Sequence, residues 1–343
     1  MNPSLDSYFV ELLGPRELIF KSETLDLSNL DSQSVAAKTL YSTISPGTEL
    51  AAWQGDPPLR PGPIYPRLVG YCNVAEIVAI GAEVQTLKVG DRILTTQAHR
   101  SAFICKQSAI MGRVPDALGS IEASTTYLFH LGYNALLKGD FRPGHAVAVL
   151  GLGALGMASV LLIQALGGQV FALSNHTDSL HHAQRMGAQG TWRKDTPHLA
   201  RLVTESTGGS GIDLVIHTSN SWDDWWLALS LPRKEGVISV VGFPGRGQPP
   251  PSFNPLDSRY FYDNQLRLVA AGFSPSIAAA PHDIRFTLAR NCSYLMQLLA
   301  SERLKAHALI GGVEPAHRII SCYEALCANR RTGLTVVLDW AQT

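Results

Sequence analysis

Three glycines with the spacing Gly-x-Gly-x-x-Gly are the part of the sequence that points most directly to chemistry. They follow the apolar, largely β-favouring run Ala146–Leu150, and residues 157–166 after them have the composition of a helix. In a strand–turn–helix unit the first glycine permits the turn, the second lets a pyrophosphate approach the backbone, and the third lets the helix pack closely on the strand. The pattern predicts a dinucleotide site made by Gly151, Gly153, Ala154, Leu155 and Gly156.

The residues after the next predicted strand, at 169–173, bear on which dinucleotide is preferred. An NAD-preferring enzyme usually places Asp or Glu there, to accept hydrogen bonds from the ribose hydroxyls. Ser174, Asn175 and His176 instead offer neutral donors that suit a 2′-phosphate. No arginine follows at once, and Asp178 slightly weakens the case. We expect NADP(H) to be preferred over NAD(H), with further cofactor contacts from three residues that follow later strands, Thr218, Gly242 and Phe243.

Composition limits the class of protein. The chain has 343 residues, long enough for two domains, with 45% hydrophobic and 16% charged residues and a formal net charge of zero. No basic cluster indicates a nucleic-acid or membrane partner, so the expected partner is a small-molecule substrate. The first residues lack the features of a signal peptide. Five cysteines without a Cys-x-x-Cys pair suit free thiols in a reducing compartment, and predict a cytoplasmic protein.

The predicted elements change character along the chain. Residues 1 to about 115 are β-rich, with short strands predicted at 34–41, 74–80 and 91–96 between Gly and Pro turns, and the Pro-rich stretch 56–63 is expected to be an exposed loop. Helical periodicity begins at Ala123–Leu137. Strands and helices then alternate, which predicts an α/β fold with a parallel doubly wound sheet. The strands are expected at 146–150, 169–173, 212–217, 236–241 and 266–271; the helices at 155–166, 178–186, 196–206 and 222–230; and two helices and a strand in the tail at 283–301, 315–328 and 334–339.

This order of elements resembles the medium-chain dehydrogenase/reductase family, whose members include the alcohol dehydrogenases. Stretches that carry the resemblance over nearly the whole chain are Ser42–Leu50, Tyr65–Tyr71 with Val78–Val84, Val89–Ile93, Gly132–Leu136 and the segment from Pro143 through the glycine pattern. The resemblance implies a GroES-like catalytic domain at 1–120 and 280–343, a Rossmann dinucleotide-binding domain at 121–279, and a homodimer. We expect the strand at 266–271 to lie at a sheet edge, where it could pair across a two-fold axis. The first hundred residues are also similar to the hydroxyethyl-bacteriochlorophyllide dehydrogenases, which suggests a role in secondary metabolism.

The departures from the family pattern concern its catalytic zinc. The resemblance places the first ligand at about Ser45, replaces Gly-His-Glu by Gly70, Tyr71 and Cys72, and places the last ligand near Tyr127. Ser and Tyr do not hold Zn²⁺, which requires thiolate, imidazole or carboxylate ligands. The four-cysteine structural-zinc lobe of the family has no counterpart either. We therefore expect the fold and the cofactor, but no metal.

Without zinc, hydride transfer still requires a proton or hydrogen-bond donor for the developing oxyanion or enolate. Five residues are the candidate catalytic groups: Tyr71, Tyr127, Ser45, Thr48 and His99, with His130 nearby in sequence and Glu49 expected to brace the loop. Each has a structural alternative as a hydrogen-bonded core residue. The leading hypothesis is a zinc-independent NADP(H)-dependent oxidoreductase acting on a carbonyl or alcohol. An enoyl- or quinone-type C=C reductase and a non-catalytic cofactor-binding protein remain as alternatives.

Overall fold

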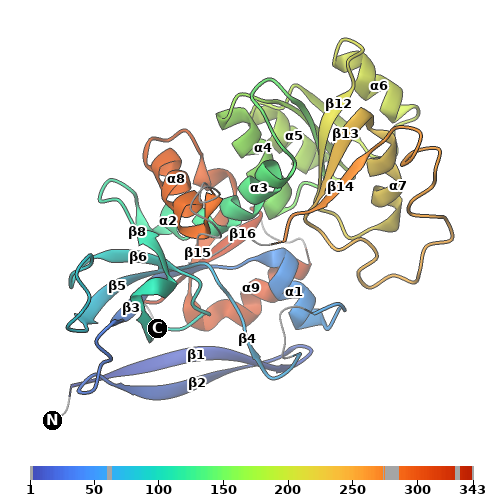
Figure 1. Cartoon of the computed structure of the whole chain (residues 1–343). Helices are drawn as coiled ribbons and strands as arrows, with labels where there is room; N and C mark the ends of the chain where they lie inside the picture. Colours follow the sequence, from blue (N-terminus) through green and yellow to red (C-terminus); the bar gives the residue numbers. More distant parts are fainter. Residues whose placement is uncertain (1–2, 60–63, 273, 275–285, 329–332, 342–343) are drawn as a thin grey trace. The chain divides into compact units, whose positions relative to one another are not determined.

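The computed structural model describes residues 3–59, 64–272, 274, 286–328 and 333–341, which form two compact units. The first unit contains Met1–Leu128 and Ser274–Thr343, and the second contains Phe129–Phe273 (Figure 1). The division thus falls after Leu128 rather than at the expected 120/121. The helix α2 (Ser120–Ala123) lies in the first unit because it contacts β3 (Ser34–Thr43) and α8 (Leu288–Ala300) there.

The second unit is built on a parallel six-stranded sheet with the order β11-β10-β9-β12-β13-β14. Counted along the chain this is the order 3-2-1-4-5-6 of a dinucleotide-binding sheet, in which the direction of winding reverses between β9 and β12. The strand β14 lies at an edge, as the sequence predicted. The strand bounds are β9 Ala146–Leu150, β10 Gln169–Ser174, β11 Gly190–Arg193, β12 Ile212–His217, β13 Pro232–Val240 and β14 Arg267–Ala270.

Four helices follow strands of this sheet, and they cover both of its faces. α4 (Ala154–Ala165) and α5 (Thr177–Arg185) lie on one side, and α6 (Leu199–Ser206) and α7 (Trp222–Ser230) on the other (Figure 1). All five residues of β9 are buried, as expected for a central strand covered on both faces. The core of the unit is apolar along β9, β10 and β12, and includes Phe171, Val215 and Trp225.

The first unit holds two sheets. A three-stranded sheet, β2-β1-β4, contains the antiparallel pair β1 (Ser4–Gly14) and β2 (Glu17–Asp26) together with β4 (Arg67–Leu68). A seven-stranded sheet follows the order β15-β16-β3-β5-β6-β8, with β7 paired to β3. Its remaining bounds are β5 Asn73–Ile80, β6 Arg92–Thr95, β7 Ala102–Lys106, β8 Ile110–Arg113, β15 Ile310–Pro315 and β16 Thr335–Asp339.

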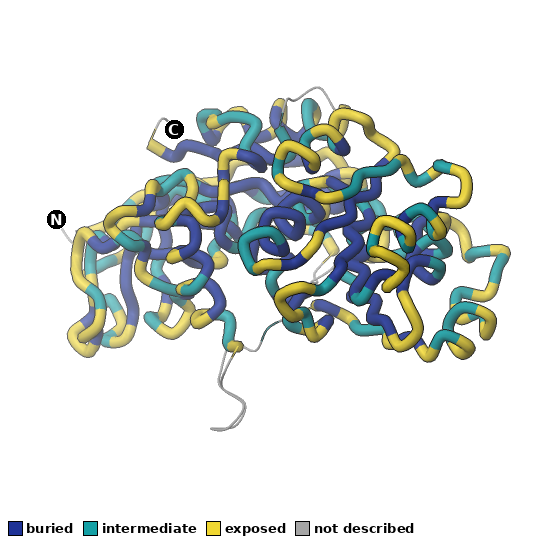
Figure 2. Tube along the Cα trace, turned by 90° about the horizontal axis from the view of Figure 1, so that it is seen from above, coloured by how far each residue is buried: buried dark blue, intermediate teal, exposed yellow. Residues whose placement is uncertain are grey.

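Helices of the first unit close its core. α1 (Pro46–Gln54) and α9 (Ile319–Cys327) contact each other, and Trp53 and Tyr323 meet edge-on with ring centroids 5.7 Å apart. α3 (Thr126–Lys138) begins in this unit and continues into the other. Figure 2 shows long buried stretches of chain between exposed loops, in agreement with central strands such as β9, all of whose residues are buried.

Several elements differ from the sequence prediction. Residues 46–54 form a helix because Pro46 occupies its first turn and Gly55, at φ 82°, ends it in the left-handed conformation. The strand β11 was not predicted, since Gly190–Arg193 is short and only partly buried. β13 begins at Pro232, four residues earlier than expected, and β15 was missed. The helix expected at 283–301 spans Leu288–Ala300, with residues 283–285 outside the described part, as are 60–63 of the Pro-rich loop.

Within those described ranges, none of the helices combines the length and the apolar character that crossing a bilayer requires.

Candidate functional site

The glycine loop of the second unit has the geometry that a dinucleotide requires. Gly151 ends β9 with φ 95°, in the left-handed region that favours glycine. A Cβ at Gly156 would lie 1.8 Å from the Gly151 carbonyl oxygen, so only glycine allows the loop and α4 to approach this closely. A Cβ at Gly153 would meet no atom within 4 Å, and this open space borders the N-terminus of α4.

Three other predicted cofactor residues lie after the neighbouring strands. Thr218 follows β12, and its hydroxyl donates to the carbonyls of Leu150 and Gly151 at 3.1 and 3.0 Å. Gly242 follows β13, where a Cβ would lie 2.3 Å from the Ser219 carbonyl oxygen. Phe243 is the next residue. All three therefore lie near the carboxyl ends of β9 and β12, between which the direction of winding reverses. Ligands generally bind at this place in such sheets.

The loop after β10 carries the residues predicted to contact the adenosine 2′ position. Asn175 and His176 are exposed, whereas Ser174 is 3% exposed and its Oγ accepts from the His176 N–H at 3.1 Å. The Ser174 side chain therefore stabilises the turn and presents little surface to a ligand. The exposed residues of this segment carry no carboxylate before Asp178, in the first turn of α5.

These features fit a dinucleotide. The open space beside Gly153 leaves room for a pyrophosphate, which the first amides of α4 and the positive end of its dipole would stabilise. Ala154 and Leu155 supply the first two helical amides of α4. The residues predicted from the glycine pattern are thus at one end of one helix.

In the first unit, the residues at the family's zinc positions come together as a group of hydroxyls. The Tyr71 phenol donates to Ser45 Oγ and lies 3.2 Å from Thr48 Oγ1. The ring of Tyr127 meets that of Tyr71 edge-on, with centroids 5.4 Å apart. We call these four residues the hydroxyl cluster. Both tyrosines are half-buried, and Ser45 is buried.

Burial determines the protonation of this cluster. It raises the pKa of Tyr71 well above the usual value for a phenol, and it raises the pKa of Tyr127 to about 12. Both phenols therefore stay protonated at neutral pH, which suits a hydrogen-bond donor and disfavours a base. Burial also lowers the pKa of His130 to about 4, so this histidine is neutral at pH 7.

A buried polar network lies behind the hydroxyl cluster, centred on Glu49. One carboxylate oxygen accepts from the Ser45 N–H at 2.6 Å. The other accepts from the Tyr323 hydroxyl at 2.5 Å and lies 2.9 Å from His99 Nε2. Glu49 is 2% exposed, so its oxygens depend on these partners in place of water. The carboxylate thus braces the loop before α1, as the sequence predicted.

The donors in this network identify the His99 tautomer. Trp340 Nε1 can only donate, and it does so to Ser42 Oγ at 2.8 Å. The Glu49 carboxylate can only accept, so His99 Nε2 carries the proton in their 2.9 Å contact, and His99 Nδ1 lies 2.8 Å from Ser42 Oγ.

His99 is accordingly separate from the hydroxyl cluster. It is fully buried and both ring nitrogens bond to Ser42 and Glu49, so its prediction as a catalytic candidate finds no support in its position. Gly70, at φ 90°, makes room for the imidazole, since a Cβ there would lie 2.6 Å from the His99 ring. Its contacts give His99 a structural role.

The residues at the family's zinc positions do not fit a metal. Tyr71 and Tyr127 are phenols and Ser45 is an alcohol, none of which is a zinc ligand. Burial raises the pKa of the neighbouring Cys72 thiol well above its usual value, which disfavours the thiolate that zinc binds. Among the residues that the structure describes, no three His, Cys, Asp or Glu side chains are grouped so that they could hold a metal ion.

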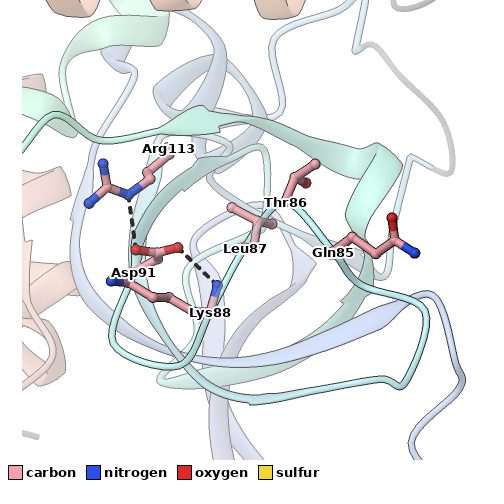
Figure 3. A pocket seen from close by; sticks show the side chains of 6 residues that line it. All are labelled: Gln85, Thr86, Leu87, Lys88, Asp91 and Arg113. Carbon is pink, nitrogen blue, oxygen red and sulfur yellow. Dashed lines mark hydrogen bonds and ion pairs between the residues drawn. The ribbon is translucent and has the colours of Figure 1, made fainter.

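A surface pocket of the first unit does not include any of the predicted catalytic residues. It is lined by residues of the turn before β6 and by β8, with the Asp91 carboxylate at its edge (Figure 3). Arg113 Nε and the Lys88 N–H each donate to Asp91 at 2.9 Å, so this acid is engaged in holding the turn. The pocket therefore does not coincide with the candidate site.

Sequence reasoning missed the outer members of the Glu49 network and one residue near the cofactor loop. Tyr323, Trp340 and Ser42 come from segments far apart in the chain, and no local spacing connects them. Arg193 was missed because β11 was missed: it pairs in register with Ser174. The strand-like composition of Gly190–Arg193 at a βαβ distance was the available signal.

Comparison with known proteins finds dehydrogenases among the matches. A family model described as zinc-binding dehydrogenase matches residues 154–284. An alcohol dehydrogenase of Rhizobium meliloti is 29% identical over 228 residues, which cover 57% of this chain and 66% of that protein. A sorbitol dehydrogenase of Bacillus subtilis is 24% identical over 233 residues, covering 59% and 64%. The matched part thus spans slightly under two thirds of these relatives' length.

The structural comparison covers almost the entire chain. An alcohol dehydrogenase from Thermus sp. ATN1 has a TM-score of 0.78 at 20% identity, covering 97% of this chain and 99% of that one. The predicted fold class is confirmed: an α/β protein with a Rossmann sheet and a β-rich GroES-like unit. The chain is thus similar in sequence to dehydrogenases over part of its length, and in fold to an alcohol dehydrogenase over nearly all of it.

Proposed function

We propose that this protein is a zinc-independent oxidoreductase that uses NADP(H) to transfer hydride to or from the carbonyl or alcohol of a small or secondary-metabolite substrate. The observation that carries the proposal is the hydroxyl cluster: at three positions where the resemblance places zinc ligands, Ser45, Tyr71 and Tyr127 are grouped by a hydrogen bond and a ring contact. Two of the relatives that match are an alcohol dehydrogenase and a sorbitol dehydrogenase by name, which supports the oxidoreductase class.

The glycine loop supports the cofactor part of the proposal. When bound, the nicotinamide cofactor supplies or accepts the hydride. The chain's own contribution is to bind the pyrophosphate at Gly151–Gly156 and the N-terminus of α4. The lack of a carboxylate at Ser174, Asn175 and His176 supports NADP(H) over NAD(H).

The hydroxyl cluster supports the donor part. A neutral Tyr71 hydroxyl can donate a hydrogen bond to the oxyanion that develops on a carbonyl during reduction. Its raised pKa keeps the phenol protonated at neutral pH, and its single proton, which is donated to Ser45 Oγ in the structure, would turn to the developing negative charge. Ser45 and Thr48 orient the phenol, because both of their hydroxyl oxygens are within reach of it.

The test is cofactor oxidation by the purified full chain against matched panels of ketones, aldehydes, enones and quinones. We expect NADPH to be oxidised by members of the carbonyl panel, with the alcohol product identified by mass. Consumption of enones or quinones alone would establish the C=C reductase alternative. Tight NADPH binding with no turnover on any panel would contradict an enzymatic role.

The sheet edge at β14 leads to one further proposal, a homodimer in which two copies pair through this strand. Sedimentation equilibrium at micromolar concentration tests it, since a monomeric mass would contradict the proposal.

A further inference from the structure

An arginine lies beside the loop after β10, where the proposed cofactor's adenosine would be recognised. Arg193 ends β11 and pairs in register with Ser174, the last residue of β10. Residues in register on adjacent strands lie about 5 Å apart, well within the reach of an arginine side chain. Its Nη1 donates to the Asn175 carbonyl at 2.7 Å, which fixes the guanidinium next to the loop.

We propose that Arg193 is the residue that binds the 2′-phosphate of NADP(H) and thereby sets the cofactor preference. This inference rests on the proposed function. Ser174 is buried and stabilises the turn, whereas the Arg193 side chain is 47% exposed and carries the charge that a phosphate dianion requires. The recognition group of this loop is therefore supplied by the neighbouring strand.

The neighbouring cation, Lys194, is already paired with a buried carboxylate. Lys194 lies 2.6 Å from Asp224, and both side chains are largely buried, so the ammonium is held by that carboxylate. Arg193 pairs with Asp195 through two bonds of 3.0 and 2.8 Å, but this carboxylate is exposed. An exposed ion pair contributes little, so a phosphate can compete with Asp195 for the guanidinium.

The Arg193 guanidinium has N–H donors left with which to bind a phosphate. Of its five N–H groups, three are used in the bonds to Asn175 and Asp195 that the described residues show, which leaves two. A planar fork of this kind matches the geometry of phosphate oxygens. Asp195 then acts as an internal competitor whose removal should strengthen phosphate binding.

The experiment measures binding by calorimetry with two nicotinamide-free probes, adenosine 2′,5′-bisphosphate and adenosine 5′-monophosphate, on the full chain. For Arg193→Gln we expect affinity for the bisphosphate to fall by roughly tenfold or more, because a charge-assisted bond is lost, with affinity for the monophosphate unchanged. Asp195→Asn should raise bisphosphate affinity. The control is Arg201→Gln, which removes a similar charge from α6, where Arg201 pairs with Glu205; it should change neither.

Each outcome decides the proposal. If the unaltered protein prefers the bisphosphate and Arg193→Gln keeps that preference, the phosphate is bound elsewhere: the Arg193 proposal fails while NADP(H) use stands. If the unaltered protein shows no preference, the NADP(H) preference itself fails. Equal loss of both probes in Arg193→Gln would indicate that the arginine only holds the loop. If that variant does not fold, Asp195→Asn decides: unchanged bisphosphate affinity overturns the proposal.

Discussion

The glycine loop of the second unit and the hydroxyl cluster of the first depend on their sequence in different ways. The loop is local: Gly151, Gly153 and Gly156 lie within six residues, where Gly151 has a left-handed φ, Gly156 allows a close approach and Gly153 leaves open space. The cluster is assembled from α1, the loop before β5 and the start of α3, and its supporting network adds Tyr323 from α9. A site made by neighbouring residues can be predicted from their spacing, whereas a site assembled from distant segments cannot.

The two regions also differ in what holds them in place. Behind the hydroxyl cluster, Glu49 and His99 are buried and satisfied, and they hold the Ser45 loop in place. In the glycine loop the support is the backbone itself together with one side chain, the Thr218 hydroxyl that donates to the Leu150 and Gly151 carbonyls. We therefore expect side-chain changes to be most damaging in the first unit, and methyl additions at glycine to be most informative in the second.

The largest expected effect is Glu49→Ala. It leaves the Ser45 amide, the Tyr323 hydroxyl and His99 Nε2 without their acceptor. Each buried unsatisfied donor costs about 1–3 kcal/mol, so the free energy of unfolding should fall by several kcal/mol in total. Urea unfolding followed by fluorescence measures this. Glu49→Gln, which keeps one acceptor oxygen, is the matched control and should lose less; equal stability of all three proteins would contradict the network's role.

Tyr71→Phe tests the chemistry of the same unit. Loss of a hydrogen-bond donor to a developing oxyanion typically lowers kcat about 100- to 1,000-fold. NADPH oxidation with a substrate from the carbonyl panel measures the rate, and thermal unfolding and NADPH affinity should hold. Tyr127→Phe tests the second candidate donor, whose ring contacts that of Tyr71. Because burial raises the pKa of Tyr71, its loss of a proton should not limit the rate between pH 6 and 9. A rate changed less than tenfold in both variants would place the donor elsewhere.

The glycine loop is tested by a pair of alanines. Gly156→Ala brings a methyl group to 1.8 Å from the Gly151 carbonyl oxygen, so the backbone must shift, at roughly 1–3 kcal/mol of stability. Gly153→Ala points its methyl group into open space, so stability should be unchanged while NADPH affinity falls. Thermal unfolding and calorimetry together distinguish the two. Undiminished NADPH affinity in Gly153→Ala would contradict a pyrophosphate site at this position.

The smallest expected effect is a change of preference in Ser174→Asp. The new carboxylate would lie beside Arg193, its partner in register on β11, and would offset the charge of the guanidinium. We expect the ratio of NADPH to NADH affinity to fall by roughly tenfold, about 1.4 kcal/mol in binding free energy. Competitive titration with both cofactors measures this, with Asn175→Asp on the same exposed turn as a comparison. An unchanged ratio would count against recognition at this loop.

The sequence predicted the dinucleotide sheet well, because buried parallel strands are continuous apolar runs and glycine marks each close approach. It missed Gly190–Arg193, since a short, partly buried edge strand lacks that signal. It also missed the helix at Pro46–Gln54, although the sequence contains the glycine, Gly55, that ends this helix. The grouping of Ser45, Tyr71 and Tyr127 came from the family resemblance, while the bonds of Glu49 to His99 and Tyr323 depend on tertiary packing that local spacing does not contain.

The most direct measurement for the central claim is the rate of NADPH oxidation by protein dialysed exhaustively against a chelator, with its metal content determined on the same sample. The positions that bind zinc in the family are here Ser45, Tyr71 and Tyr127, grouped as neutral hydroxyls. We predict less than a tenth of an equivalent of zinc, on the order that trace contamination gives, and a rate equal to that of untreated protein. Loss of turnover on dialysis, with recovery on addition of one equivalent of zinc, would contradict the account.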